Sequence, residues 1–126
     1  CLRIGFVPSA EIRIFPYILP RLRVKIPKLQ ICTLNLKETD QITELKKGDL
    51  DIIFINQDFQ NDTFASQLVL KEPLVFMLPK QHPFAKFEEI KLEQLKELEL
   101  TILSNKLSQP LSKTILQYMH LYLFIP

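Results

Sequence analysis

Apolar residues recur along this chain with two different spacings, one typical of strands and one typical of helices. Residues 2–7 form a short apolar run in which only Arg3 is charged, and this run predicts a first strand. Apolar residues then follow at helical spacing between positions 9 and 26. Because Pro20 removes an internal hydrogen bond from this segment, we predict a helix that is kinked or starts late and that Pro27 ends.

The stretch at residues 39–56 predicts a helix, a stop and a strand in succession. A short side-chain oxygen on Thr39 or Asp40 can cap the start of the helix. Gly48 can end the helix, because glycine adopts the left-handed conformation without a steric penalty. Residues 50–55 are apolar except for one aspartate, which is typical of a strand covered on both faces in a parallel sheet.

The other apolar runs predict further elements of the same two kinds. Residues 29–36 alternate as a second strand of the same sheet. The later predictions are one long strand or two at residues 67–70 and 74–78, a short helix at 92–98, a strand at 100–103 and a last helix at 111–122. Strands that alternate with helices indicate an α/β fold with a mostly parallel sheet.

Length and charge narrow the class of protein. The 126 residues suffice for one modest domain or two small lobes. A net charge of +2 gives no strongly basic surface of the kind that binds nucleic acid. No apolar run approaches the roughly 20 residues that a membrane helix needs, so no membrane partner is predicted. The chain enters a strand pattern at once, without an initiator Met or a signal peptide, which suggests a piece of a longer protein.

The two cysteines, Cys1 and Cys32, are too few for a disulfide framework. Cys32 lies in a strand-like run, and we interpret it there as a small buried apolar residue rather than a reactive thiol. This use of cysteine fits a reducing compartment, so we expect a cytoplasmic protein.

Small and polar residues follow three of the predicted strands at the points where the strands end. Ser9 and Ala10 follow the first, Thr39 follows the second and Asn56 follows the third. In open parallel sheets, ligands bind beyond these carboxyl ends, where helix starts offer unpaired N–H groups, so this edge suits a carboxylate or another small anion. Ser9 and Thr39 are also ordinary helix caps, and the residues alone leave both interpretations open.

Catalytic chemistry finds little support along the chain. His82 and His120 have no Cys, Asp or His at a metal-binding spacing. The two glycines, Gly5 and Gly48, form no phosphate-binding loop, and no Gly-x-Ser-x-Gly elbow occurs. We therefore predict no catalytic residues, no cofactor and no metal.

Four motifs then occur in order along the chain. They are Leu2-Arg3-Ile4-Gly5-Phe6-Val7-Pro8-Ser9-Ala10, the pair Pro16 and Pro27 around the first helix, Leu45-Lys46-Lys47-Gly48-Asp49-Leu50-Asp51, and Glu72-Pro73-Leu74-Val75 leading to Leu78-Pro79-Lys80-Gln81-His82-Pro83-Phe84-Ala85. Together they span nearly the whole chain, which resembles the effector-binding domain of LysR-type transcriptional regulators. The resemblance implies a type II periplasmic-binding-protein-like fold, whose two lobes of mostly parallel sheet and flanking helices hold a small inducer between them.

The resemblance also implies partners and a pocket. In the intact regulator, a change in lobe angle is passed to a winged helix-turn-helix, so DNA is contacted only through a domain that is not in this chain. A homodimer or tetramer is implied as well, with candidate contacts on the outer faces of the helices at 15–26 and 111–122. The implied ligand-binding residues are Ser9, Ala10, Glu38, Thr39, Asn56, Ser104, Asn105, Pro110 and Leu111.

Two departures from the family pattern bear on these expectations. The family's helix-start threonine aligns with Glu38, whose charge would repel a carboxylate, so either Thr39 replaces it or the effector is not a simple anion. The chain also stops at Pro126, before such a domain is complete. We therefore expect residues 1–72 to form the first lobe and residues 73–126 to form the crossover strand and the start of the second.

Two other classes of protein share this scaffold. A secreted solute-binding transport receptor has the same lobed fold and is the alternative prediction. An enzyme on the scaffold is less favoured, because it would need an acid–base or nucleophile pair in the cleft and the sequence offers none.

Overall fold

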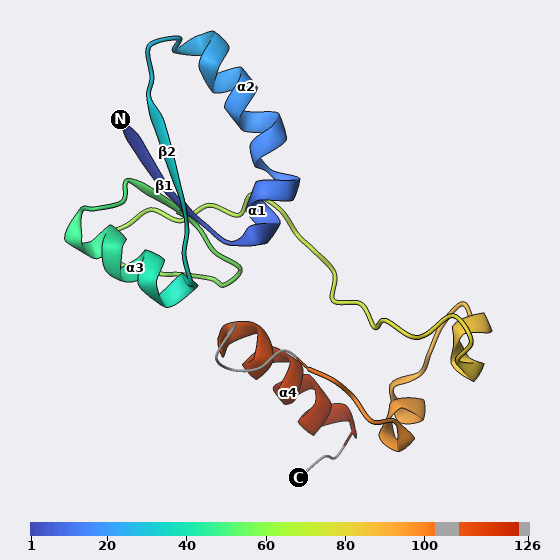
Figure 1. Cartoon of the computed structure of the whole chain (residues 1–126). Coiled ribbons are helices and arrows are strands. Elements are labelled where there is room, and N and C mark those ends of the chain that lie inside the picture. Colours follow the sequence, from blue (N-terminus) through green and yellow to red (C-terminus); the bar gives the residue numbers. More distant parts are fainter. Residues whose placement is uncertain (103–108, 124–126) are drawn as a thin grey trace.

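Three parallel strands form the sheet around which the first part of the chain is arranged. The computed structural model describes residues 1–102 and 109–123. The strands are β1 (Leu2–Phe6), β2 (Ile31–Asn35) and β3 (Ile52–Phe54), in the order β2-β1-β3 (Figure 1). Both pairings are parallel, which confirms the predicted α/β class with a parallel sheet. The second and third strands are shorter than predicted, and Ile52 on the edge strand β3 is 43% exposed rather than covered on both faces.

The first helical segment is interrupted at Ile14, between α1 (Pro8–Arg13) and α2 (Phe15–Lys25). A continuous helix would need a hydrogen bond from the backbone of residue 16 to the carbonyl of Ile12, and Pro16 has no N–H to donate. Pro16 instead lies in the first turn of α2, where no intrahelical partner is needed. The prediction of a kinked or late helix is confirmed, although the interruption lies at Ile14 rather than at the proline inside α2.

The core packs between the sheet and this helical segment. Phe15 meets Phe6 and Phe54 edge to face, with ring centroids 5.0 and 5.6 Å apart. Ile4 and Ala10 complete the buried cluster. The chain therefore fixes the ends of β1 and β3 against the start of α2, close to the carboxyl edge of the sheet.

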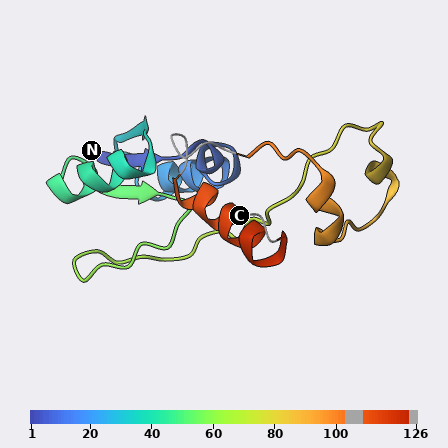
Figure 2. The same ribbon diagram turned by 90° about the horizontal axis from the view of Figure 1, so that it is seen from below.

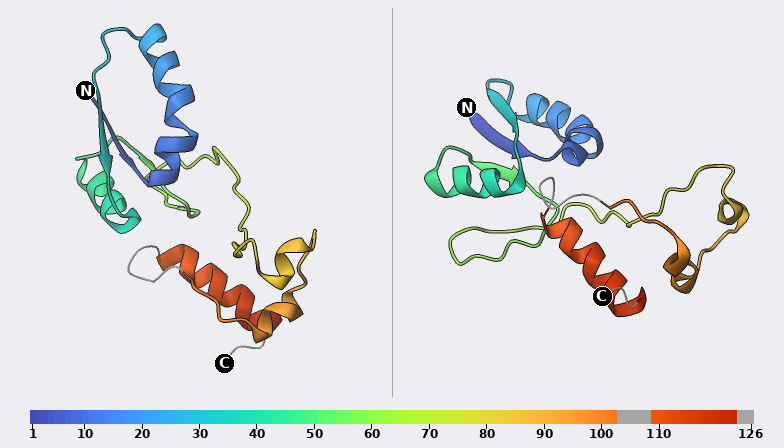
Figure 3. Two further views of the ribbon diagram at one scale, coloured as in Figure 1. Left: turned by 45° about the vertical axis from the view of Figure 1, so that its right-hand side comes forward. Right: turned by 60° about the horizontal axis from the view of Figure 1, so that its bottom comes forward.

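The third helix, α3 (Glu38–Lys47), lies on the side of the sheet away from α1 and α2 (Figures 1 and 3). Its close approach to β1 depends on Gly5, since a Cβ there would lie 2.6 Å from Leu50 Cδ1 and 3.1 Å from Gln41 Oε1. Gly48 ends the helix with φ of 82°, and this confirms the predicted left-handed stop.

Both helix caps on the carboxyl side of the sheet differ from prediction. The N-cap of α1 is Val7 and that of α3 is Lys37, and neither makes a side-chain capping bond. Ser9 therefore lies inside the first turn of α1, because Pro8 supplies the preset φ of the first helical position. Thr39 likewise lies inside α3, so the capping interpretations of Ser9, Thr39 and Asp40 are wrong.

No strand forms among residues 57–102, although strands were predicted at 67–70, 74–78 and 100–103. Residue 103 lies outside the described residues. The chain after the sheet instead runs extended, as Figure 2 shows, and its apolar side chains are exposed, Met77 by 92%. A strand needs a hydrogen-bonded neighbour, and this segment has none in the described part of the chain. The strand predictions for this segment, which were based on its apolar residues alone, are therefore wrong.

The last elements are the short 3₁₀ helices η1 (Pro83–Lys86) and η2 (Leu92–Glu97) and the helix α4 (Gln109–Leu123). The helices predicted at 92–98 and 111–122 are thus present, the first as a 3₁₀ helix. α4 packs against η2 (Figure 3) and buries Leu95 and Ser112.

Candidate functional site

Asn56 joins two of the strand ends at the carboxyl edge of the sheet. Its side-chain Oδ1 accepts a hydrogen bond from Ser9 Oγ at 3.3 Å, and its backbone N–H donates to Glu38 Oε1 at 2.8 Å. Ser9 lies in the first turn of the helix after β1, Glu38 begins the helix after β2, and Asn56 follows β3. The structure therefore brings together three residues that are far apart in the sequence.

The other carboxyl oxygen of Glu38, Oε2, is buried and has no hydrogen-bond partner within the described part of the chain. The residue as a whole is only 8% exposed. An unpaired buried polar atom costs about 1–3 kcal/mol of stability, so such atoms are rare in folded proteins. This oxygen is therefore a candidate acceptor for a group that the chain itself does not supply.

The buried face of α3 explains why Glu38 points toward the sheet. The predicted apolar positions Ile42 and Leu45 are partly buried, and Glu38 and Gln41 lie four residues before them on the same face. Gln41 is fully buried, and its Nε2 donates to the carbonyl of Leu36 at 2.8 Å. Sequence reasoning missed Gln41, although its helical spacing to Leu45 was a usable signal.

Two other predicted ligand residues, Ala10 and Thr39, do not join this cluster through their side chains. Ala10 is 2% exposed and packs in the core, with its N–H bonded to the carbonyl of Val7 at 2.9 Å. Thr39 is exposed, and its carbonyl accepts a bond from Thr43 Oγ1 at 2.9 Å. At the start of α3, Glu38 rather than Thr39 is thus the inward-facing residue.

The predicted residues of the later loop are described only in part. Ser104 and Asn105 lie outside the described residues. Pro110 and Leu111 lie in the first turn of α4, where Leu111 is partly buried and the side chain of Pro110 is not described.

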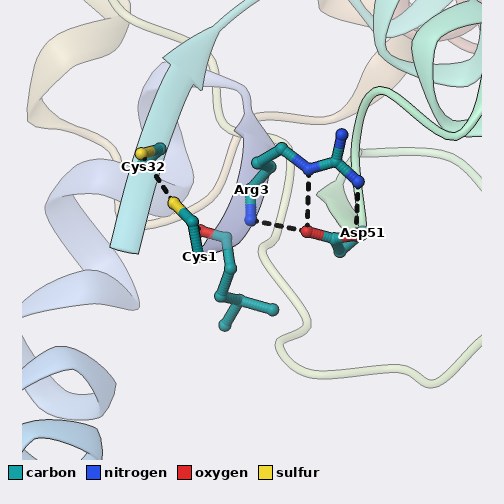
Figure 4. Close-up of polar contacts among 5 residues, drawn as sticks. Cys1, Arg3, Cys32 and Asp51 are labelled. Carbon is teal, nitrogen blue, oxygen red and sulfur yellow. Dashed lines mark hydrogen bonds and ion pairs between the residues drawn. The ribbon is translucent and has the colours of Figure 1, made fainter. Parts of the chain in front are cut away.

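The amino edge of the sheet carries a different arrangement, centred on Asp51. Arg3 donates to Asp51 three times, from its backbone N–H at 2.8 Å, from Nε at 3.1 Å and from Nη2 at 2.7 Å (Figure 4). The backbone N–H of Asp51 in turn donates a hydrogen bond to the carbonyl of Arg3, at 2.9 Å. The hydrogen bonds and positive charge of Arg3 lower the pKa of the Asp51 carboxyl to about 2. This edge is thus closed by mutually satisfied groups.

One interpretation of the cysteines is wrong. Cys32 on β2 is exposed rather than buried, and its Sγ lies 2.8 Å from that of Cys1 (Figure 4). The residue lies on the edge strand β2, in which every residue from Cys32 to Asn35 is exposed.

Elsewhere, an open and largely polar hollow lies in the loop after β3, lined by Phe59, Gln60, Asn61, Asp62, Phe64 and Ser66. It includes none of the predicted ligand residues. Among residues 1–102 and 109–123, no cluster of three or more His, Cys, Asp or Glu side chains is arranged to hold a metal ion. Within the same residues, no helix has the length and apolar character needed to span a membrane.

Comparisons with known proteins cover nearly all of the chain. Residues 2–121 match the family model described as the LysR substrate binding domain. Among curated proteins, the chain is similar to the Hca operon transcriptional activator HcaR of Escherichia coli K12, with 36% identity over 75% of this chain and 32% of the relative. It is also similar to the HTH-type transcriptional regulators AlsR of Bacillus subtilis 168 (34% identity, 76% of this chain, 32% of the relative) and TtuA of Agrobacterium vitis (33%, 86% and 36%). The chain thus spans about a third of the length of these relatives.

Proposed function

The chain belongs to the LysR substrate-binding domain family, and from this premise we propose that it is the small-molecule effector-sensing part of a bacterial transcriptional regulator. The observation that carries the proposal is the cluster of Ser9, Glu38 and Asn56 at the carboxyl edge of the sheet, with one buried carboxyl oxygen left unpaired. Ligands of open parallel sheets bind at this edge. The relatives are named as regulators of transcription, which favours this function over a transport receptor or an enzyme.

The chemistry of the cluster indicates what part of an effector would bind there. Glu38 Oε2 needs a hydrogen-bond donor, and Ser9 and Asn56 present a hydroxyl and an amide beside it. The effector therefore offers a hydroxyl, amide or amine to Glu38. A carboxylate on the same molecule would contact a part of the site other than Glu38, because two carboxylates repel each other.

The domain architecture follows as part of the proposal. Residues 1–72 form the first lobe, and residues 73–126 are the crossover segment, which is extended but unpaired among the described residues, and the start of a second lobe, with the effector between the two. The exposed apolar residues in the extended segment, such as Val75 and Met77, support this assignment, because they form an apolar surface that a second lobe would cover.

The proposed regulator acts in the cytoplasm as a homodimer or tetramer and reaches DNA through a separate domain. Support for an assembly comes from the exposed apolar side chains of Tyr17 and Val24 on α2 and of Leu116 and Tyr118 on α4. A Val24→Glu substitution should lower the molecular mass measured by sedimentation if α2 forms the contact.

A ligand titration of the intact regulator tests the pocket. Small hydroxy, amino and carboxylate compounds are first screened by thermal shift, and the best compound is then titrated against the Ser9→Ala variant. Loss of the Ser9 hydroxyl should weaken the effector response by about tenfold while DNA binding is retained. Ser66→Ala removes an exposed loop hydroxyl and is the matched control. An unchanged response in Ser9→Ala would show that the pocket is assigned to the wrong edge.

A further inference from the structure

The two cysteine sulfurs lie at the amino edge of the sheet, opposite the proposed effector site. Cys1 Sγ and Cys32 Sγ are 2.8 Å apart, and both residues are exposed free thiols (Figure 4). The distance must shorten by less than 1 Å to reach the length of about 2.05 Å that a disulfide bond requires. An oxidant in solvent can therefore reach a pair of sulfurs that already lie side by side.

The strand register explains why these two residues meet. Arg3 on β1 pairs with Cys32 on β2, so their side chains share one face of the parallel sheet. Cys1 lies two residues before Arg3 and therefore points to the same face. A hydrogen bond from the N–H of Leu2 to the carbonyl of Gln30, at 2.7 Å, holds the first residues in this register. The approach of the sulfurs thus follows from the backbone pairing.

We propose that Cys1 and Cys32 are a reversible redox pair that forms an intrachain disulfide with a low-molecular-weight disulfide such as oxidised glutathione. One cysteine thiolate attacks a sulfur of the small disulfide, which gives a mixed disulfide and releases one small thiol. The second cysteine thiolate then attacks the protein sulfur, forms the Sγ–Sγ bond and releases the second small thiol. The two cysteines lose two electrons, the small disulfide gains them, and the two cysteine protons leave on the released thiols.

The Cys1–Cys32 disulfide, together with the Arg3–Asp51 ion pair, would link all three strands at the amino edge of the sheet. Cys1 and Cys32 would join β1 to β2 covalently, and Arg3 already joins β1 to Asp51 ahead of β3. The closed loop runs from residue 1 to residue 32 and contains α1 and α2, including Ser9. Glu38 and Asn56 lie outside this loop, so oxidation restrains one side of the proposed effector site and leaves the other free. The redox pair itself does not depend on the effector proposal.

Mass spectrometry and thermal melting of the full chain test the proposal. After treatment with oxidised glutathione and alkylation of free thiols, the chain should carry an internal disulfide between the peptides of Cys1 and Cys32, with no retained glutathione. Its melting temperature should rise by roughly 5 °C or more, because the cross-link restricts the unfolded chain, and dithiothreitol should reverse the rise.

Single substitutions separate this outcome from ordinary thiol reactivity. Cys1→Ser and Cys32→Ser should each keep one glutathione on the remaining cysteine and show no rise in melting temperature. The proposal is overturned if the unsubstituted chain keeps glutathione on both cysteines, or if the disulfide joins two chains instead of one. A disulfide that forms without raising the melting temperature would overturn the proposal that this bond stabilises the pairing of the strands.

Discussion

The two edges of the parallel sheet use polar groups in opposite ways. At the amino edge, Arg3 and Asp51 satisfy each other through four hydrogen bonds, two of which involve backbone groups. At the carboxyl edge, Glu38 uses one oxygen to hold the N–H of Asn56 and leaves the other buried and unpaired. The first arrangement joins strands, whereas the second retains an acceptor that folding alone does not satisfy.

This difference separates residues that stabilise the sheet from residues that prepare a site. A satisfied pair contributes to stability whether or not anything is bound. An unpaired buried acceptor lowers stability until a donor reaches it, which is a common property of functional sites. Substitutions at the amino edge should therefore change stability with little effect on the effector, and substitutions at Glu38 should do the reverse.

Gly5→Ala should have the largest effect, because it disturbs the sheet between the two edges. The new Cβ would lie 2.6 Å from Leu50 Cδ1 and 3.1 Å from Gln41 Oε1, and both side chains are buried. Such overpacking costs about 1–3 kcal/mol, so the free energy of unfolding measured in urea should fall by that amount.

Gly48→Ala is the matched control for this prediction. A Cβ at Gly48 meets nothing within 4 Å, but the φ of 82° is unfavourable for alanine. The control should lower the free energy of unfolding by only about 1 kcal/mol. Equal losses in the two variants would show that close approach of α3 to β1 is not what requires Gly5.

Glu38→Met should separate stability from function at the carboxyl edge. The substitution removes the unpaired buried oxygen and also the bond to Asn56, and these two changes oppose each other. The free energy of unfolding should therefore change by less than about 1 kcal/mol, whereas effector affinity should fall at least tenfold. Isothermal titration and urea unfolding measure the two quantities. A large loss of stability with unchanged affinity would make Glu38 a structural residue.

Local signals made the first half of the chain predictable. The glycine stop at Gly48, the short apolar strands and the proline interruption each depend on residues close in sequence, and each is present. The carboxyl-edge positions of Ser9 and Asn56 followed from strand order alone. The orientation of Glu38 did not, because a polar residue on the buried face of α3 is recognised only when its helical spacing to the apolar stripe is counted.

Non-local requirements account for the predictions that were wrong. Residues 67–70 and 74–78 have strand-like composition, but a strand also needs a neighbour, and composition does not supply one. Cys32 was assigned to the interior from its type, although its exposure depends on its place on an edge strand whose residues are mostly exposed. The caps were misplaced because the N-caps are Val7 and Lys37, each two residues before the hydroxyl-bearing residue, Ser9 or Thr39, that was expected to cap the helix.

Asp51→Asn should change the pH dependence of stability at the amino edge. The folded pKa of Asp51 is about 2, below its ordinary value of 3.8, so the unfolded chain binds this proton more tightly. The stabilising effect of the carboxylate is present above about pH 4 and is lost as the pH falls toward 2. At pH 7 the variant should melt a few degrees lower than the unsubstituted chain. This difference in melting temperature should disappear as the pH falls from about 4 toward 2.

Two measurements decide this prediction. Melting curves from pH 7 to pH 2 give the difference in melting temperature between Asp51→Asn and the unsubstituted chain. Asp62→Asn is the control, at an exposed loop aspartate. Effector affinity at pH 7 should stay within about twofold of the unsubstituted chain, because Asp51 lies at the other end of the sheet. A difference in melting temperature that stays constant down to pH 2 would mean that the charge of Asp51 does not stabilise the strands.

Glu44→Gln should have the smallest effect on stability. It measures the contribution of an ion pair that lies within one helix and does not connect strands. Lys47 lies one turn along the same helix, 2.8 Å from Glu44, and lowers the pKa of the Glu44 carboxyl through its hydrogen bond. The Lys47 side chain is exposed and the Glu44 side chain is partly exposed, and the pair joins no separate elements. The melting temperature should therefore change by no more than about 1 °C at pH 7. A loss as large as that of Asp51→Asn would show that local charge, rather than the connection between β1 and the start of β3, accounts for the stability of the amino edge.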